Sequence, residues 1–88
     1  MPPSKFIWTP LFEKDFRGLP KELQARTEKA LHLLLQDPRH ASLRARKMQG
    51  LDDIWEARVS IAYRITYQLA GHTIILRRLG SHDILRKQ

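Results

Sequence analysis

Arginine side chains are the groups of this sequence best suited to chemistry, and they gather in its second half. Residues 38–88 carry ten basic and four acidic side chains, whereas residues 1–37 carry six and five. Eight of the ten basic residues in the second half are arginine. The planar guanidinium group can bind phosphate through two parallel hydrogen bonds. This half therefore indicates a polyanionic ligand, most often a nucleic acid, although a solvated surface also carries such charge.

Two of these arginines lie in segments whose patterning predicts strands. Residues 54–59 and 63–69 alternate between apolar and polar side chains, as antiparallel strands with one apolar face do. The opposite face is expected to be open to solvent and to carry Glu56, Arg58, Arg64, Thr66 and Gln68. Like charges on facing strands repel each other. We therefore expect an anion between Arg58 and Arg64, either Glu56 or a ligand.

His82 is the histidine that follows the arginine-rich strand end, after Arg77, Arg78 and Gly80. An imidazole can take or give a proton near neutral pH, so His82 is a candidate acid or base. The other histidines, His32, His40 and His72, are expected to be solvated surface residues. No histidine spacing is typical of a metal site, and the chain has no cysteine. We therefore expect neither a metal nor a cofactor.

The elements that must position these residues follow from the rest of the pattern. A short strand is expected over residues 5–8, a helix after Thr9 that ends at Gly18, and an amphipathic helix from Pro20 to Asp37. A basic edge strand over 43–48 and a strand over 73–79, ended by Gly80, complete the sheet. The sequence predicts one α+β domain over residues 1–88, with both helices on the apolar face. No segment is long and apolar enough for a membrane span, so a cytoplasmic protein is expected.

Residues 47–86, KMQGLDDIWEARVSIAYRITYQLAGHTIILRRLGSHDILR, resemble the RelE/ParE toxin superfamily of bacterial type II toxin–antitoxin systems. The segment LFEKDFRGLP and the leucine-rich helix after it are similar to the family's helical hairpin. The resemblance implies two helices on a twisted, mainly antiparallel sheet of about four strands. It also implies a ribosome-dependent endoribonuclease that cleaves mRNA in the decoding site of the 30S subunit and is silenced by an antitoxin. In such enzymes the ribose 2′-OH attacks the adjacent phosphate and leaves a 2′,3′-cyclic phosphate, without a metal.

The resemblance also assigns roles to single residues. By position, Arg64 corresponds to the arginine placed against the scissile phosphate, with Arg58 and Arg78 as further cations and His82 as general acid or base. The side chains implied to hold RNA are Arg44, Arg46, Lys47 and Arg77. Where several members carry an acidic residue, this chain has Ala62, and Glu56 or Asp83 is the alternative acid or base.

Two other functions stay open on the sequence. The ParE branch of the superfamily keeps the fold, lacks the nuclease residues and poisons DNA gyrase. A non-catalytic module that binds RNA or an antitoxin is the third alternative. The presence of Arg58, Arg64 and His82 favours the nuclease branch.

Overall fold

One strand, two helices and then four strands follow each other along the chain, and the five strands form one sheet. The computed structural model describes residues 5–48, 53–81 and 83. The elements are β1 (Lys5–Trp8), α1 (Pro10–Arg17), α2 (Lys21–Gln36), the 3-10 turn η1 (Ala41–Leu43), β2 (Arg46–Lys47), β3 (Trp55–Arg58), β4 (Tyr63–Ala70) and β5 (Thr73–Ser81). The strands lie in the order β1-β5-β4-β3-β2. The predicted α+β fold is confirmed, but the sheet has five strands, because β1 joins it as an edge strand parallel to β5.

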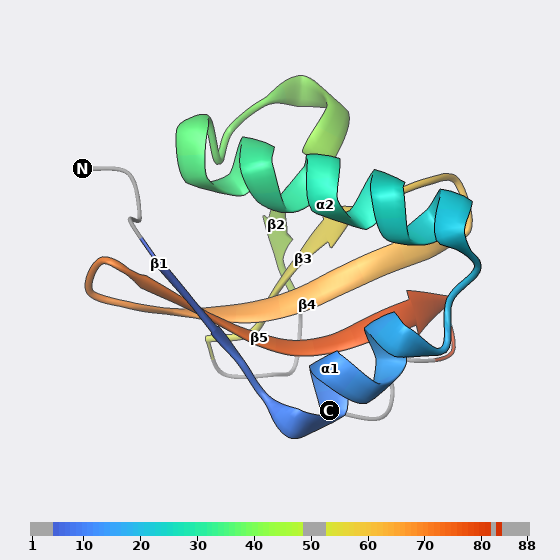
Figure 1. Cartoon of the computed structure of the whole chain (residues 1–88). Helices are drawn as coiled ribbons and strands as arrows, with labels where there is room; N and C mark the ends of the chain where they lie inside the picture. The colour runs from blue at the N-terminus through green and yellow to red at the C-terminus, as the bar shows by residue number, and fades with distance from the viewer. Residues whose placement is uncertain (1–4, 49–52, 82, 84–88) are drawn as a thin grey trace.

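Local signals in the sequence mark the start of α1 and the end of α2. The hydroxyl oxygen of Thr9 accepts a hydrogen bond from the backbone N–H of Phe12 at 3.3 Å, and Pro10 occupies the first turn of α1. Helix α2 ends at Gln36, before Asp37 and Pro38, where a further turn would clash with the proline ring. Figure 1 shows α2 crossing one face of the sheet and α1 lying beside the second half of β5.

The core lies between the helices and the predicted apolar face of the sheet. Its fully buried members are Phe12 from α1, Leu34 from α2, Ala57 from β3, and Ile65, Ile74 and Leu76 from β4 and β5. Because these side chains come from every large element, they fix how the helices sit on the sheet.

The prediction of an open opposite face is wrong at two positions. Thr66 is 0% exposed and Glu56 is 5% exposed. Both polar groups are hydrogen-bonded, as buried polar groups must be: Thr66 accepts from the backbone N–H of Arg78, and Glu56 binds Arg46. Arg58, Arg64 and Gln68 are partly open on this face.

A β-bulge in β5 decides which way its arginines point. Tyr67 of β4 pairs with Leu76, but the preceding Thr66 pairs with Arg78, so Arg77 is an extra residue in β5. The strand also continues through Gly80, which pairs with Arg64, so the prediction that Gly80 ends the strand is wrong. As a result, Arg78 lies on the same face as Arg64.

Burial of Tyr67 gives a prediction about alkaline stability. The residue is 2% exposed, and burial raises the pKa of its phenol from 10.0 to about 12. Because the unfolded chain releases this proton first, the stabilisation is complete below about pH 10 and is lost as the pH rises through about 12. Between about pH 9 and pH 11.5 the free energy of unfolding should therefore fall by up to about 2 kcal/mol more in the wild type than in Tyr67→Phe. Urea unfolding at both pH values tests this, and equal losses in the two proteins would contradict it.

Candidate functional site

Two arginines face each other at the end of the β3–β4 ladder. Arg58 of β3 is paired in register with Arg64 of β4. Directly opposed residues of antiparallel strands project their side chains to the same face at about 4.5–5.5 Å between Cβ atoms. On its other side Arg64 is paired with Gly80, which has no side chain. The register therefore places the two arginines side by side at the end of the ladder, and Gly80 adds no side chain beside Arg64.

Arg64 is anchored by the connection between β3 and β4. Its Nη1 atom donates hydrogen bonds to the carbonyl oxygens of Ser60 at 2.8 Å, Ile61 at 3.1 Å and Tyr63 at 3.0 Å. All three bonds use the same nitrogen, and the other nitrogens of the guanidinium donate to no part of the chain that the structure describes. The side chain is thus held in place while part of its donor fork stays available.

Arg58 is half-buried, and its charge is not balanced. Its Nε atom is inaccessible to solvent and has no hydrogen-bond partner. Burial lowers the pKa of the Arg58 guanidinium, and the positive charges of Arg44 and Arg64 lower it further. Within residues 5–48, 53–81 and 83, no carboxylate forms an ion pair with any of these three arginines. The fold therefore maintains a local excess of positive charge at this site, which an anion would relieve.

A hollow of about 400 Å³ opens beside Arg64. It is lined by Ile61, Ala62, Arg64, Ser81 and Asp83. Ala62 and Asp83 thus belong to one hollow although 21 positions separate them in the sequence. Asp83 is exposed, and its carboxylate is the acidic group of this hollow.

Arg78 is engaged in a buried ion pair. Its Nε donates to Oδ2 of Asp15 at 2.9 Å, and the two side chains are only 16% and 14% exposed. The same carboxylate oxygen accepts from the backbone N–H of Leu79 at 3.0 Å. Strand β1 pairs with β5 only as far as Leu76. Beyond Leu76, the carboxylate of Asp15 accepts a hydrogen bond from the β5 backbone in place of a neighbouring strand. Arg78 thus ties α1 to the sheet and is not a free cation.

Glu56 does not lie between Arg58 and Arg64 as an ion-pair partner. Its buried carboxylate accepts from Nε of Arg46 at 2.5 Å, across the β2–β3 pair. Arg46 is itself 74% exposed at its side chain, so the pair sits at the surface edge of the sheet. Of the two alternatives that the sequence left open for an anion beside Arg58, Glu56 is therefore wrong, and a ligand stays a prediction.

The remaining residues predicted to hold RNA have separate surroundings. Arg44 is exposed and has a positive φ of 45° after η1. Lys47 lies 3.7 Å from Asp53 in an exposed pair. Arg77, the bulge residue, donates to Oε1 of Gln68 at 3.1 Å. They do not converge on the hollow beside Arg64, and a direct role in RNA binding stays a prediction for each.

The histidines do not add an imidazole to this cluster within the described residues. His82 lies outside them, so its predicted role as acid or base stays a prediction. His40 is exposed, and its Nδ1 accepts from the backbone N–H of Ser42 at 3.1 Å, which caps η1. Sequence reasoning missed this cap, which a histidine two residues before a serine does not reveal. Over residues 5–48, 53–81 and 83 no three His, Asp or Glu side chains are arranged to hold a metal ion.

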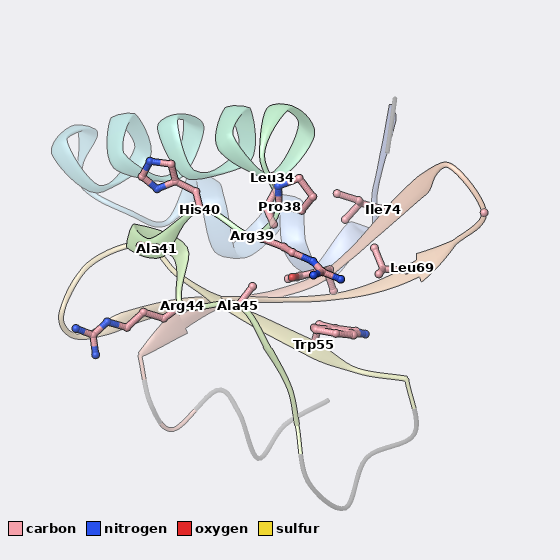
Figure 2. Close-up of a pocket in the computed structure, with 12 residues that line it drawn as sticks. Leu34, Pro38, Arg39, His40, Ala41, Arg44, Ala45, Trp55, Leu69 and Ile74 are labelled. Atoms are coloured by element: carbon pink, nitrogen blue, oxygen red, sulfur yellow. The ribbon is translucent and has the colours of Figure 1, made fainter. Parts of the chain in front are cut away.

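A second, larger hollow is apolar. It has a volume of about 610 Å³ and lies between the end of α2, η1 and the sheet, where Leu34, Trp55, Leu69 and Ile74 line it. Figure 2 shows Arg39 extending into this groove above Trp55, whereas Arg44 points away from it. The groove is chemically distinct from the arginine site.

A protein-family model now identifies the chain. The model of the ParE toxin of the type II toxin–antitoxin system parDE matches residues 6–85, nearly the whole chain. The chain belongs to the ParE toxin family. The resemblance to the RelE/ParE superfamily is thereby confirmed. A search of curated proteins finds no match to this toxin. None of the helices described here is long and apolar enough to cross a membrane.

Solved structures share the toxin's fold at low sequence identity. YafQ in the DinJ–YafQ toxin–antitoxin complex of E. coli has a TM-score of 0.78 at 18% identity, over 97% of this chain and 98% of that one. RelE in the RelB–RelE antitoxin–toxin complex of Methanococcus jannaschii has a TM-score of 0.73 at 21% identity, over 92% and 95%. A YoeB/ParE toxin from Agrobacterium tumefaciens has a TM-score of 0.77 at 14% identity, over 90% and 99%. These likenesses confirm the fold, and two of these relatives were solved with an antitoxin.

Proposed function

We propose that this toxin is a ribosome-dependent endoribonuclease that cleaves mRNA without a metal ion. The observation that supports this most is the Arg58–Arg64 pair, in which two arginines are directly opposed in the strand register and no described carboxylate forms an ion pair with either. Such a pair costs stability in the free protein. It suits a phosphate that gains negative charge during reaction, because prepositioned donors stabilise that charge without reorganising.

The proposed reaction needs only proton transfers and charge stabilisation. The ribose 2′-oxygen forms a bond to the adjacent phosphorus while a base takes its proton. The bond from phosphorus to the 5′-oxygen of the next nucleotide then breaks, and that oxygen takes a proton from an acid. The products are a 2′,3′-cyclic phosphate and a free 5′-hydroxyl. Arg64 and Arg58 would hold the non-bridging oxygens of the phosphorane.

Asp83 is a better acid or base for this reaction than Glu56. Asp83 is exposed in the hollow that holds Arg64, and it stands across that hollow from Ala62, where several members of the superfamily carry an acid. Glu56 is buried and already accepts from Arg46. We therefore assign one proton transfer to Asp83 and keep His82 as the partner for the other.

The remaining cations act away from the reacting atoms. Arg78 serves as a positioning residue, because Asp15 holds it between α1 and β5. Exposed Arg44 and the pairs at Arg46 and Lys47 offer contacts for the RNA backbone at the β2 edge, and Arg77, which donates to Gln68, would contact RNA outside the hollow beside Arg64. The proposed partners are mRNA in the decoding site of the 30S subunit and a cognate antitoxin, in the cytoplasm where translation occurs.

The family match supports a second candidate function. The matching family model is that of a ParE toxin, and the resemblance implies that the ParE branch poisons DNA gyrase. In that function the arginine pair would bind a protein or DNA anion and no RNA would be cut.

Mapping nucleic-acid ends in cells separates the two functions. After brief induction of the toxin, we expect new mRNA 5′ ends within translated regions and no increase in double-strand DNA breaks. Induction of Arg58→Gln, at matched protein level, should produce far fewer such ends. Cleaved DNA and a DNA-damage response without new mRNA ends would overturn the nuclease proposal and support gyrase poisoning.

A further inference from the structure

A third hollow, of about 410 Å³, lies between α2, η1 and the end of β3 and is strongly basic. Arg26 and Lys29 of α2, Ser42 of η1 and Arg58 of β3 supply its polar lining, and Ala30 and Leu43 are among its apolar members. No residue of α2 was singled out from the sequence for ligand binding. We will call this cavity the basic hollow and define it by its polar lining residues Arg26, Lys29, Ser42 and Arg58.

The charges of the basic hollow have little internal compensation. Among the described residues, the carboxylate that pairs with its cations is Glu22, which lies 3.6 Å from Arg26 on the exposed side of α2. Their side chains are 80% and 55% exposed, and such solvated pairs contribute little. Arg58 brings a buried Nε without a hydrogen-bond partner, and Arg44 adds a further positive charge nearby. An anion is therefore the ligand that this lining favours.

The place of the basic hollow in the sheet indicates which anion. Arg58 lines it, and Arg64, which is opposed to Arg58 in the strand register, lines the hollow with Asp83, so each hollow has one member of the arginine pair in its lining. We propose that Arg26 and Lys29 of the basic hollow bind a backbone phosphate of RNA next to the phosphate held by Arg58 and Arg64, with the apolar members of the hollow against the nucleoside. Its volume is large enough for a unit of nucleotide size. This proposal rests on the proposed RNA-cleaving function and adds the path of the RNA towards α2.

The test compares two double variants with the same change in charge. Arg26→Gln with Lys29→Gln removes two charges from the basic hollow. Arg17→Gln with Lys21→Gln removes two charges from exposed positions outside it, including an arginine that, like Arg26, has an i,i+4 glutamate partner. The probes are a single-stranded RNA carrying 2′-O-methyl groups, which cannot be cleaved, and 70S ribosomes programmed with the same RNA.

We expect the hollow variant to bind the probe about tenfold more weakly than the wild type at about 0.1 M salt, and the control less than about twofold. The slope of log K against log salt should become shallower by about 0.7 for each phosphate that the variant no longer binds. Weaker binding of free RNA indicates a contact to mRNA, and weaker binding of ribosomes alone indicates ribosomal RNA. Equal binding of the probes by the two variants would overturn the proposal that the basic hollow binds RNA. A defect of the hollow variant that is confined to antitoxin binding would overturn it as well. A wild type that binds neither probe would instead refute the proposed function.

Discussion

Arg58→Gln should lower RNA cleavage on ribosomes by about a hundredfold while leaving the toxin as stable as the wild type or more stable. The loss of rate follows because a donor aimed at a charged transition state is worth about 10²–10³ in rate. The stability follows because Arg58 faces Arg64, has no ion-pair partner among the described residues and keeps a buried Nε without a hydrogen bond. A residue that matters to the fold alone would change stability and activity in the same direction.

Arg46→Gln is the matched control on the neighbouring strand. This arginine is bound by the buried carboxylate of Glu56, so its removal should destabilise the protein by about 1–3 kcal/mol. Cleavage should stay within about tenfold of the wild type, measured at a temperature where both proteins are folded. Initial rates on programmed ribosomes and urea unfolding give the two readouts. Full activity of Arg58→Gln, or a large loss of its stability, would contradict the role assigned to the arginine pair.

Asp15→Ala should produce the largest loss of stability among the substitutions considered for this fold, about 3–5 kcal/mol. The change leaves the guanidinium of Arg78 at 16% exposure without its carboxylate, and the backbone N–H of Leu79 loses its acceptor. For a domain of this size each kcal/mol shifts the melting temperature by about 4–8 °C. Thermal unfolding followed by circular dichroism should therefore show a fall of more than about 12 °C.

Glu13→Ala is the control for this ion pair on the same helix. Glu13 pairs with Arg17 at 2.6 Å, but both side chains are largely exposed, so the loss should stay below about 1 kcal/mol. Adding Arg78→Met to Asp15→Ala should recover part of the lost stability, because it removes the buried charge that Asp15 neutralised. A loss of less than about 1 kcal/mol in Asp15→Ala would show that the Asp15–Arg78 pair does not hold α1 on the sheet.

The helices and the strand pairing around Arg58 and Arg64 could be predicted because their signals are local. Thr9, Pro10 and Gly18 mark the ends of α1, and the alternation in residues 63–69 places Ile65 and Tyr67 in the core. The bulge at Arg77 could not be predicted from the alternation of side chains. It inserts one extra residue, which changes the face of every side chain after it in the strand.

Parts of the site depend on contacts between segments far apart in the chain. Asp15 lies 63 positions from Arg78, and no local pattern indicates that the first helix would neutralise that arginine. Arg26 and Lys29 similarly look like ordinary charges on the solvent face of a helix, and only the packing of α2 over β3 brings them to Arg58. Ala62 and Asp83 meet in one hollow because β4 and β5 pair along their length.

Replacing a single ribose of an mRNA on the ribosome by 2′-deoxyribose tests whether the toxin cleaves RNA by 2′-OH attack. The toxin is mixed with 70S ribosomes carrying an mRNA that has either a ribose or a 2′-deoxyribose at the mapped cleavage position. We predict rapid cleavage of the all-ribose mRNA to a 2′,3′-cyclic phosphate and a 5′-hydroxyl, and no cleavage at the deoxy position. Equal cleavage of both mRNAs would contradict this mechanism. An all-ribose mRNA that stays intact, with a toxin that arrests growth when it is expressed in cells, would contradict it as well.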